Sequence, residues 1–459
     1  MKKTLLALMS CMVLTISAQT GLDQTAVQLA AKMAPGWNLG NTLEATNSAN
    51  LYTNNAGLAA ETSWQRTKTT QAVIDYVKSL GFRSVRIPCS WVAGHISDAD
   101  NYTIDAAWMA RVKEVVDYCI NAGLYVVLND HWDGGWLENN IAAGGATETK
   151  NKAVLEAIWK QIATEFRDYD EHLLFAGLNE PNAETQTATN YLKQYEQIFI
   201  NTVRATGGNN AKRVLIIQGP ATNIDNTCSY MTTLPTDTQE GKLMIEVHYY
   251  APWQWWGMTA DDSWGKMFYY WGAANHVSGS QHNATWGEES YMEAQLNKMK
   301  SQFHDKGVAV YIGEFGANWR TITAAGESQD KHNASIKHHY KTFMKKCFEK
   351  GMIPVVWDIN SPREADSPAR MSMGLIDRTN RSIFCSFMLD GIHEAMQEAG
   401  IPITGIIAVK NVTQQQHNGA VYDLKGRQIM AASKSSDAEV GAQLSKGIYI
   451  RNGKKFVVK

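Results

Sequence analysis

The sequence predicts an α/β protein, a (β/α)8 TIM barrel followed by a small β-module. Two observations predict this fold class. First, eight short apolar runs alternate with helical patterns between Pro35 and about residue 398, as in a barrel of parallel strands. Second, the pattern changes after about residue 400 to closely spaced strand-like runs. We therefore expect a signal peptide at 1–18, a barrel domain at 19–400, and a linker with a small β-module at 401–459.

The apolar runs have the length of strands, and the segments between them have the length and periodicity of helices. Helical patterns occupy segments such as Thr69 to Leu80, Ala106 to Ala122, Ala153 to Phe166 and Lys331 to Lys350. The strand-like runs cover residues 37–41, 84–88, 125–129, 173–178, 214–217, 243–249, 308–313 and 353–357. Active sites of such barrels lie at the carboxyl ends of the strands, so functional residues are expected there.

The N-terminal residues indicate where the protein is located, and the net charge limits the class of partner that it binds. Lys2 and Lys3 precede a mostly apolar run from Leu5 to Ile16, which is typical of a secretory signal peptide. That run is too short to span a membrane, and no later stretch is long enough. A net charge of −2 argues against a nucleic-acid binder. We expect a secreted or cell-surface protein without a membrane span, and a monomer.

Seven of the eight runs end in polar or aromatic side chains that suit catalysis or binding. The fifth run, ending in Gln218-Gly219-Pro220, shows no such group. The remaining runs contribute Asn38 on the first, Arg86 on the second with His95 beyond it, His131 and Trp132 after the third, Asn179 and Glu180 after the fourth, His248 and Tyr250 at the sixth, Glu314 at the seventh and Trp357 at the eighth.

Two of these residues form the pair that glycoside hydrolysis needs. A retaining glycosidase uses one carboxyl group to protonate the leaving oxygen and another to attack the anomeric carbon. In a barrel, Glu180 and Glu314 face each other across the top. Arg86 and Tyr250 are expected to keep Glu314 ionised by charge and hydrogen bonds. Glu180 must start protonated, so we expect a drier site and a nearby like charge to raise its pKa.

The other residues fit supporting roles around one sugar ring. The Asn179 amide can hydrogen-bond a sugar 2-hydroxyl, an interaction that strengthens in the oxocarbenium-like transition state. His131 and His248 are expected to orient carboxyl groups or sugar hydroxyls. Trp357 offers a face on which the sugar can stack.

Three alternatives remain beside this interpretation. His131, Asp133 and His248 are conceivable metal ligands, but they lack a spacing such as HExxH, so no metal and no cofactor is expected. A polysaccharide-binding barrel without catalysis is the second alternative. The Trp-rich loop at 251–256, continued by a long insertion to residue 290, is either a wall of the substrate cleft or a loop packed by its own aromatic residues.

At this point the chain resembles glycoside hydrolase family 5, a retaining family whose catalytic glutamates lie on strands 4 and 7. The resemblance covers roughly residues 33–398 and is closest to subfamily 4, mostly endo-β-1,4-glucanases. The motifs that carry it are Trp37-Asn38-Leu39-Gly40-Asn41, Glu61-Thr62-Ser63-Trp64, Arg86-Ile87-Pro88, His131, Leu178-Asn179-Glu180-Pro181, His248-Tyr249-Tyr250, Ile312-Gly313-Glu314-Phe315-Gly316 and Val356-Trp357-Asp358.

The resemblance implies a role for each matching residue. Glu180 is expected to be the acid/base and Glu314 the nucleophile of a secreted endo-β-1,4-glucanase that cleaves internal bonds of cellulose-type glucans. His95 matches a recurring histidine after strand 2. Many members have His-His after strand 3, and Trp132 replaces the second here, so hydroxyl contacts or substrate preference are expected to differ. Xyloglucan, mixed-linkage glucan, xylan and mannan remain alternative substrates. The remaining matches, expected to build the −1 subsite, are Arg86, His131, Asn179, His248, Tyr250 and Trp357.

The C-terminal module resembles a type IX secretion sorting domain. The match rests on residues 421–427, on residues 444–450 and on the basic C-terminal residues Lys454, Lys455 and Lys459. It implies a Bacteroidetes-type bacterium and an interaction with that secretion machinery. A carbohydrate-binding module is the alternative, which the shortness of the segment disfavours. The Asn452-Gly453 pair predicts a hairpin turn.

Overall fold

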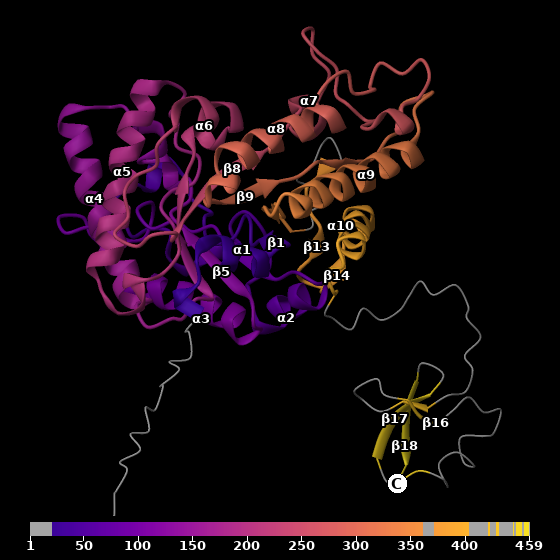
Figure 1. Ribbon diagram of the computed structural model, residues 1–459, viewed down its shortest axis with the longest axis horizontal. Helices are drawn as coiled ribbons and strands as arrows, with labels where there is room; N and C mark the ends of the chain where they lie inside the picture. The colour runs from indigo at the N-terminus through magenta and orange to yellow at the C-terminus, as the bar shows by residue number, and fades with distance from the viewer. Residues whose placement is uncertain are drawn as a thin grey trace, which may run out of the picture. The chain divides into compact units, whose positions relative to one another are not determined.

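The computed structural model describes residues 21–360, 371–403, 421–422, 428–430, 444, 447–451 and 454–458. The chain divides into two compact units, Met1–Gly405 and Ile406–Lys459 (Figure 1). The predicted signal peptide at 1–18 and residues 404–420 of the predicted linker lie outside the described residues.

The first unit is a closed barrel of eight parallel strands, in the order β1-β11-β9-β8-β7-β6-β5-β2. Each lies at a predicted apolar run, so the (β/α)8 prediction is confirmed. Their bounds are β1 Gly36–Asn38, β2 Ser84–Ile87, β5 Tyr125–Asn129, β6 Leu173–Ala176, β7 Leu215–Gln218, β8 Leu243–Tyr249, β9 Ala309–Phe315 and β11 Ile353–Val356.

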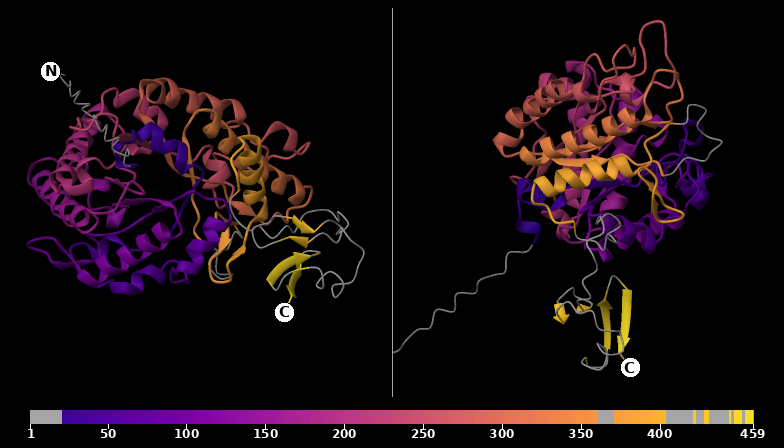
Figure 2. Two further views of the ribbon diagram at one scale, coloured as in Figure 1. Left: turned by 60° about the horizontal axis from the view of Figure 1, so that its bottom comes forward. Right: turned by 90° about the vertical axis from the view of Figure 1, so that its right-hand side faces the viewer.

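Helices surround the strands, as the left panel of Figure 2 shows. Their bounds are α1 Ala26–Met33, α2 Gln71–Ser79, α3 Ala106–Asn121, α4 Gly145–Glu165, α5 Gln186–Ala205, α6 Ile224–Tyr230, α7 Trp253–Trp256, α8 Glu289–Gln302, α9 Gln329–Glu349 and α10 Ser386–Glu398. Short strands in the loops form three two-stranded sheets: β3 Ile96–Asp98 with β4 Thr103–Ile104, β10 Trp319–Arg320 with β12 Met371–Ser372, and β13 Ile376–Asp377 with β14 Ser382–Ile383.

The strands alternate their side chains between two cores. Positions such as Val127 and Leu174 point into the barrel, where α1 packs against them at the end where the strands begin. Their neighbours Val126 and Leu173 point outward to the helices. This period of two places Met244, Glu246 and His248 of β8 on one face, the inner one that carries the site.

The second unit contains a four-stranded sheet in the order β16-β15-β17-β18. Arg451 pairs with Lys454, so β17 and β18 form a hairpin around the predicted Asn452-Gly453 turn, although the turn residues lie outside the described ones. The four strands are β15 Val421–Tyr422, β16 Gln428–Met430, β17 Gly447–Arg451 and β18 Lys454–Val458. Within the described parts of the chain, no helix combines the length and apolar character needed to cross a bilayer.

Candidate active site

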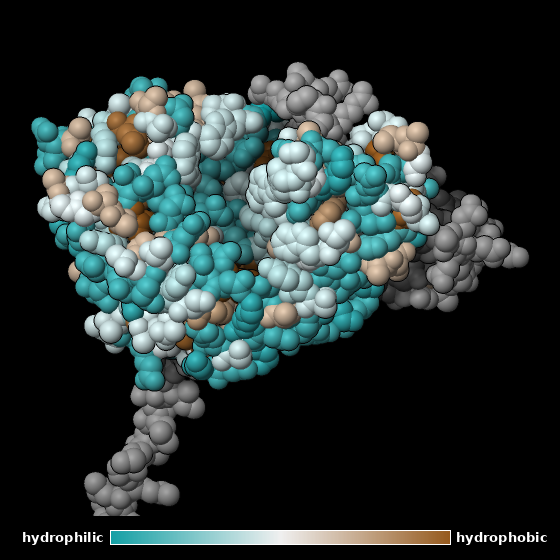
Figure 3. Space-filling model, turned by 90° about the horizontal axis from the view of Figure 1, so that it is seen from above, coloured by the Kyte–Doolittle hydropathy of each residue, from teal (hydrophilic) through white to brown (hydrophobic). Residues whose placement is uncertain are grey.

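A cleft of about 470 Å³ lies at the carboxyl ends of the barrel strands. Seen from above, the surface is hollowed by a groove with mostly hydrophilic walls (Figure 3). Glu180 follows β6 and Glu314 lies in β9, and both reach the cleft. Its lining residues are His131, Asn179, Glu180, Ala221, Thr222, Asn223, His248, Tyr250, Trp256, Glu314, Trp357 and Met373.

Arg86 is the centre of the charged network beneath this cleft. Its guanidinium is fully buried and lies 2.9 Å from Glu314 Oε1. Nη2 of Arg86 donates to Asn179 Oδ1 at 2.7 Å. Nη1, the nitrogen that contacts Glu314, also donates to Asn38 Oδ1 at 3.1 Å. Because Arg86 can only donate, it fixes the oxygen of each amide toward itself. The Asn179 NH2 group therefore remains a donor, as a sugar 2-hydroxyl would require.

Glu314 is held as the sequence predicts. Besides Arg86, the Tyr250 hydroxyl donates to Glu314 Oε2 at 3.0 Å. Burial raises the pKa of Glu314, while the charges of His248 and Arg86 oppose that rise. The carboxylate thus has one charged and one neutral donor and is only 5% exposed. This arrangement fixes its orientation toward the cleft.

Glu180 differs from the expectation in one respect. Its Oε1 lies 2.7 Å from Nδ1 of His248, and its backbone N–H donates to Glu138 Oε1 at 2.5 Å. Burial would raise the pKa of Glu180, but the hydrogen bond and charge of His248 outweigh it, so the pKa lies below its ordinary value. The predicted raised pKa of Glu180 is therefore wrong for the free protein, because the hydrogen bond and charge of His248 favour the ionised carboxylate.

Trp357 and His131 form one wall of the cleft. Their rings stack with centroids 5.8 Å apart and planes inclined by 7°. The next residue, Asp358, is fully buried and accepts from the Trp37 indole at 2.7 Å, which anchors the end of β11 to β1. The hydrogen bond between Trp37 and Asp358 thus holds the end of β11, and with it the Trp357 ring, next to β1.

The structure brings most of the predicted residues together, but not His95 or Trp132. His95 is buried and stacks on Trp108 of α3, with ring centroids 3.7 Å apart and planes at 2°. It belongs to the packing between the barrel and α3 and does not line the cleft. Trp132 is half-buried in the turn after β5 and is also absent from the lining. Asn38 lies below the cleft and contacts Arg86.

Several residues of the site were not predicted. The loop after β7, which showed no functional signal, supplies Thr222, whose hydroxyl hydrogen-bonds Glu180 and lowers its pKa. Thr222 has a left-handed φ of 44°, a strain that clusters at functional sites. Trp256 lines the cleft beside Tyr250, with ring centroids 4.6 Å apart, which favours the cleft-wall interpretation of the Trp-rich loop. Glu246, buried in β8, was visible only as a lone charge in an apolar run.

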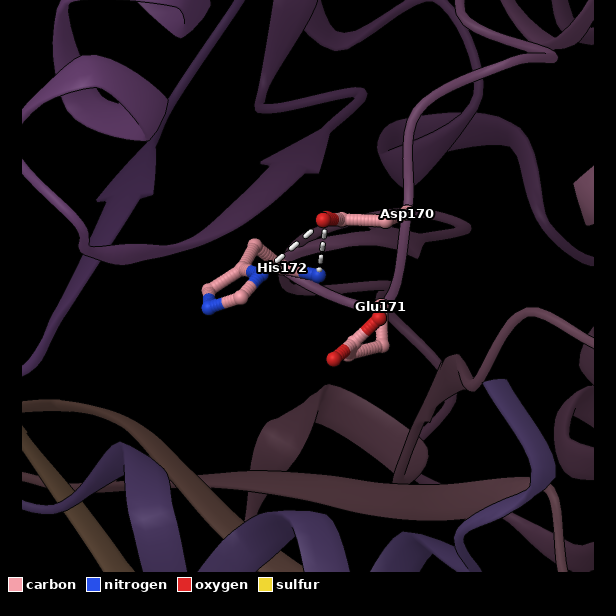
Figure 4. A group of neighbouring side chains, drawn as sticks. All are labelled: Asp170, Glu171 and His172. Carbon is pink, nitrogen blue, oxygen red and sulfur yellow. Dashed lines mark hydrogen bonds and ion pairs between the residues drawn. The ribbon is translucent and has the colours of Figure 1, made fainter. Parts of the chain in front are cut away.

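Among the described residues, two clusters have the composition of a metal site. One consists of Glu180, His248 and Glu314, in which Nδ1 of His248 lies 2.7 Å from Glu180 and 3.8 Å from Glu314. In it, one carboxyl oxygen of Glu180 lies within 4.8 Å of one of Glu314. The other cluster, at residues 170–172, lies where β6 begins and so away from the cleft (Figure 4). There, Asp170 accepts from the His172 backbone and contacts its ring at 3.0 Å.

A parallel barrel with two facing carboxyl groups, an arginine clamp and an aromatic wall at its carboxyl end defines the class of glycoside hydrolases. Comparison with known proteins gives the family. Residues 45–362 match the family "Cellulase (glycosyl hydrolase family 5)". The chain belongs to this family.

Three relatives illustrate the match. Endoglucanase A of Paenibacillus barcinonensis is 34% identical over 394 residues, covering 81% of this chain and 90% of the relative. A xyloglucan-specific endo-β-1,4-glucanase of Bacteroides ovatus is 37% identical, covering 74% of this chain and 66% of the relative. The crystal structure of a xyloglucan-specific β-1,4-glucanase from a ruminal metagenomic library has a TM-score of 0.74 at 46% identity, covering 83% of this chain and 98% of that one.

Proposed function

We propose that this chain is a secreted endo-β-1,4-glucanase that cleaves internal β-1,4-glucosidic bonds with retention of configuration. One observation carries the mechanism: carboxyl oxygens of Glu180 and Glu314 lie within 4.8 Å of each other. Retaining glycosidases hold their carboxyl groups about 5–5.5 Å apart, and inverting ones about 6.5–9.5 Å. This bound on one pair of oxygens supports the retaining spacing, in which Glu314 and not a water attacks the sugar.

The contacts assign the steps. Glu314, oriented by Arg86 and Tyr250, attacks the anomeric carbon while Glu180 delivers a proton to the departing glycosidic oxygen. The resulting glycosyl ester on Glu314 is then attacked by water, which gives its proton to Glu180. The Asn179 NH2 group, which also hydrogen-bonds Glu138, has a second hydrogen to donate to the 2-hydroxyl in both steps, and Trp357 supports the sugar ring.

Two substitutions test these roles. In Glu314→Ala, hydrolysis of carboxymethylcellulose is expected to fall by several orders of magnitude, because no nucleophile remains. In Glu180→Ala, the same loss is expected on the polymer. An aryl cellobioside whose phenolate leaves without a proton should still form the glycosyl ester in this variant. Full polymer activity in both variants would exclude the assignment.

The stereochemical outcome tests retention separately. Proton NMR of the first product from a reduced-end-labelled cello-oligosaccharide is expected to show the β-anomer before mutarotation. Initial appearance of the α-anomer would establish inversion and contradict the ester on Glu314.

Xyloglucan is the second candidate for the preferred polymer. The observation that favours it is the 46% identity to a xyloglucan-specific β-1,4-glucanase. Other similar structures are described as broad-specificity endoglucanases, such as that of Ruminococcus champanellensis at 33% identity. Initial rates on carboxymethylcellulose, mixed-linkage glucan, xyloglucan, xylan and mannan, measured at equal mass concentration, decide between them. Faster hydrolysis of mannan or xylan than of every glucan would contradict both candidates.

Export is part of the same proposal. The predicted signal peptide at 1–18, and the likeness of residues 421–459 to a type IX sorting domain, support passage to the cell surface or medium. The likeness of the barrel to subfamily 4 supports the proposed endo-β-1,4-glucanase activity. In a bacterium with the type IX machinery, the full chain is expected outside the cell, and a chain ending at Gly405 in the periplasm. Equal external yields of both would remove the sorting role.

A further inference from the structure

Glu246 lies below the cleft and is connected to both Glu180 and Glu314 through one intermediate residue each. It is fully buried on the inner face of β8. Its Oε1 lies 3.0 Å from Nε of Arg86 and 3.3 Å from Nε2 of His248. Its Oε2 accepts from the Gln218 side chain at 2.6 Å. One carboxylate therefore contacts two cationic or potentially cationic groups and one amide.

Each partner of Glu246 reaches a different catalytic carboxyl group. Arg86 continues to Glu314 Oε1 at 2.9 Å. His248 continues through Nδ1 to Glu180 Oε1 at 2.7 Å. Glu246 is thus linked through Arg86 to the proposed nucleophile, Glu314, and through His248 to the proposed acid/base, Glu180. A change in its charge is felt by both.

The backbone leaves room for this carboxylate. A Cβ added at Gly313 would lie 1.8 Å from Glu246 Oε1. The pairing of β8 with β9 shifts register at the same point, since Val247 pairs with Ile312 and His248 with Glu314. Gly313 is therefore required here because the Glu246 carboxylate occupies the place of its side chain.

We propose that Glu246 is a positioning residue that keeps Nε2 of His248 protonated, so that Nδ1 of His248 and Glu180 share the proton delivered to the glycosidic oxygen. This inference rests on the proposed function of the same site. An ionised Glu246 can only accept, so the imidazole nitrogen facing it must donate. The opposite nitrogen, Nδ1, is then the one that exchanges a proton with Glu180. The proton leaves this pair in the first step and is restored from water in the second.

The surrounding charges agree with this assignment. Burial favours a neutral His248, but the charge of Glu314 and the hydrogen bonds to Glu180 and Glu246 raise its pKa to about 10. Burial also opposes the charge on Glu246, and Arg86 reverses this and lowers its pKa. The titratable groups that face Glu246 and His248 from the packed elements are Arg86, His131, Glu180, Glu196, Tyr250, Tyr311 and Glu314.

The test is the pH dependence of kcat/KM in Glu246→Gln, which keeps the shape and removes the charge. Loss of a negative charge makes every nearby proton easier to lose. Both the alkaline limb, set by the Glu180–His248 proton, and the acidic limb, set by Glu314, are therefore expected about one pH unit lower. KM should change less than kcat, because the glucan does not touch Glu246.

Glu196→Gln is the matched control. Glu196 is also a fully buried glutamate, on α5, and accepts from the Gln218 backbone at 2.8 Å without contacting Arg86 or His248. Burial raises the pKa of Glu196 to about 8, so across the acidic limb it is neutral and Glu196→Gln removes no charge there. Its acidic limb is expected to stay in place. Lower activity in Glu246→Gln with unmoved limbs would overturn the proposal and leave Glu246 a merely structural role.

A second measurement covers the case in which Glu246→Gln does not fold. In the full-length wild type, 15N NMR of His248 is expected to show a protonated Nε2 between about pH 5 and 8. An unprotonated Nε2 there would overturn the proposal. This readout does not depend on turnover. An inactive wild type would therefore refute the proposed function while leaving the His248 result to judge this inference alone.

Discussion

At the scale of single residues, the Tyr250 hydroxyl is the simplest contact to remove. It donates to Glu314 at 3.0 Å, and its ring stays supported by Trp256 in Tyr250→Phe. A hydrogen bond to a charged group contributes about 1.5–3 kcal/mol, so kcat/KM should fall about 10- to 100-fold. Tyr249→Phe is the control, since that buried hydroxyl has no hydrogen-bond partner among the described residues and its ring stacks on Phe343. Equal losses in both would refute a specific contact with Glu314.

The acidic limb of the pH profile is the second residue-scale prediction. Burial raises the pKa of Glu314 above its ordinary 4.5. As the proposed nucleophile, Glu314 must be ionised, so activity is expected to be lost as pH falls through this raised pKa. kcat/KM on a soluble glucan should therefore decline below an apparent pKa higher than 4.5. A limb at or below that value would show that Arg86 and Tyr250 outweigh burial.

Residues that belong to motifs could be predicted, while residues that act through others could not. Arg86, Tyr250 and Trp357 lie at strand ends, where a barrel gathers its functional groups, so their convergence followed from the order of the strands. Glu246 lies inside a strand, and its partners come from β2 and β7, so only the closed barrel reveals its contacts. His95 has the chemistry of a site residue, but stacking on Trp108 places it in the packing.

At the scale of elements, the register shift between β8 and β9 makes Gly313 sensitive. In Gly313→Ala the new Cβ would meet the Glu246 carboxylate at 1.8 Å, inside a fully buried site. Overpacking of this kind costs about 1–3 kcal/mol of folding free energy, and displacing Glu246 should also lower kcat. Chemical denaturation and steady-state kinetics measure both effects. Gly265→Ala, whose Cβ would meet only Gln254 at 3.8 Å, should leave both unchanged.

A buried ion pair between Glu61 and Arg111 connects α3 to the segment before α2. Two guanidinium nitrogens reach the carboxylate at 2.7 and 2.9 Å, and both side chains are nearly buried. Arg111→Met leaves an uncompensated buried charge, which costs about 3–5 kcal/mol of unfolding free energy. The exposed pair of Arg167 and Asp168 offers the control, because Arg167→Met should change stability by less than about 1 kcal/mol. Urea denaturation distinguishes the two, and kcat of the folded fraction should stay constant.

Element positions followed from periodicity where apolar residues repeat, and failed where they do not. α4 begins at Gly145, earlier than the predicted Ala153, because residues 145–152 are mostly polar and give no apolar period. The two-residue strands in the loops are too short for a periodic signal, and β10 and β12 form only because two distant segments meet. The barrel strands were predictable because burial on both faces makes most of them predominantly apolar runs.

At the scale of the whole molecule, the distance between the proposed catalytic carboxyl groups, Glu180 and Glu314, is a property of barrel closure. Glu180 and Glu314 come from strands that are far apart in the chain. In the barrel, β6 is separated from β9 only by β7 and β8. The strand order predicts that the two residues face one cleft, but not whether they lie within 4.8 Å. That separation depends on the geometry of the buried contacts of Arg86 with Glu314 and of His248 with Glu180, which the strand order does not determine.

The division into two compact units leads to the last prediction. Every residue of the cleft, and of the charged network below it, lies within Met1–Gly405. A chain ending at Gly405 should therefore fold and hydrolyse a soluble glucan with kcat/KM within about twofold of the full chain, since a domain with its own core can fold alone. Its thermal midpoint should match the main transition of the full chain. A loss of more than about tenfold in kcat/KM, equivalent to about 1.4 kcal/mol of transition-state stabilisation, would mean that residues 406–459 act on the cleft and are not confined to export.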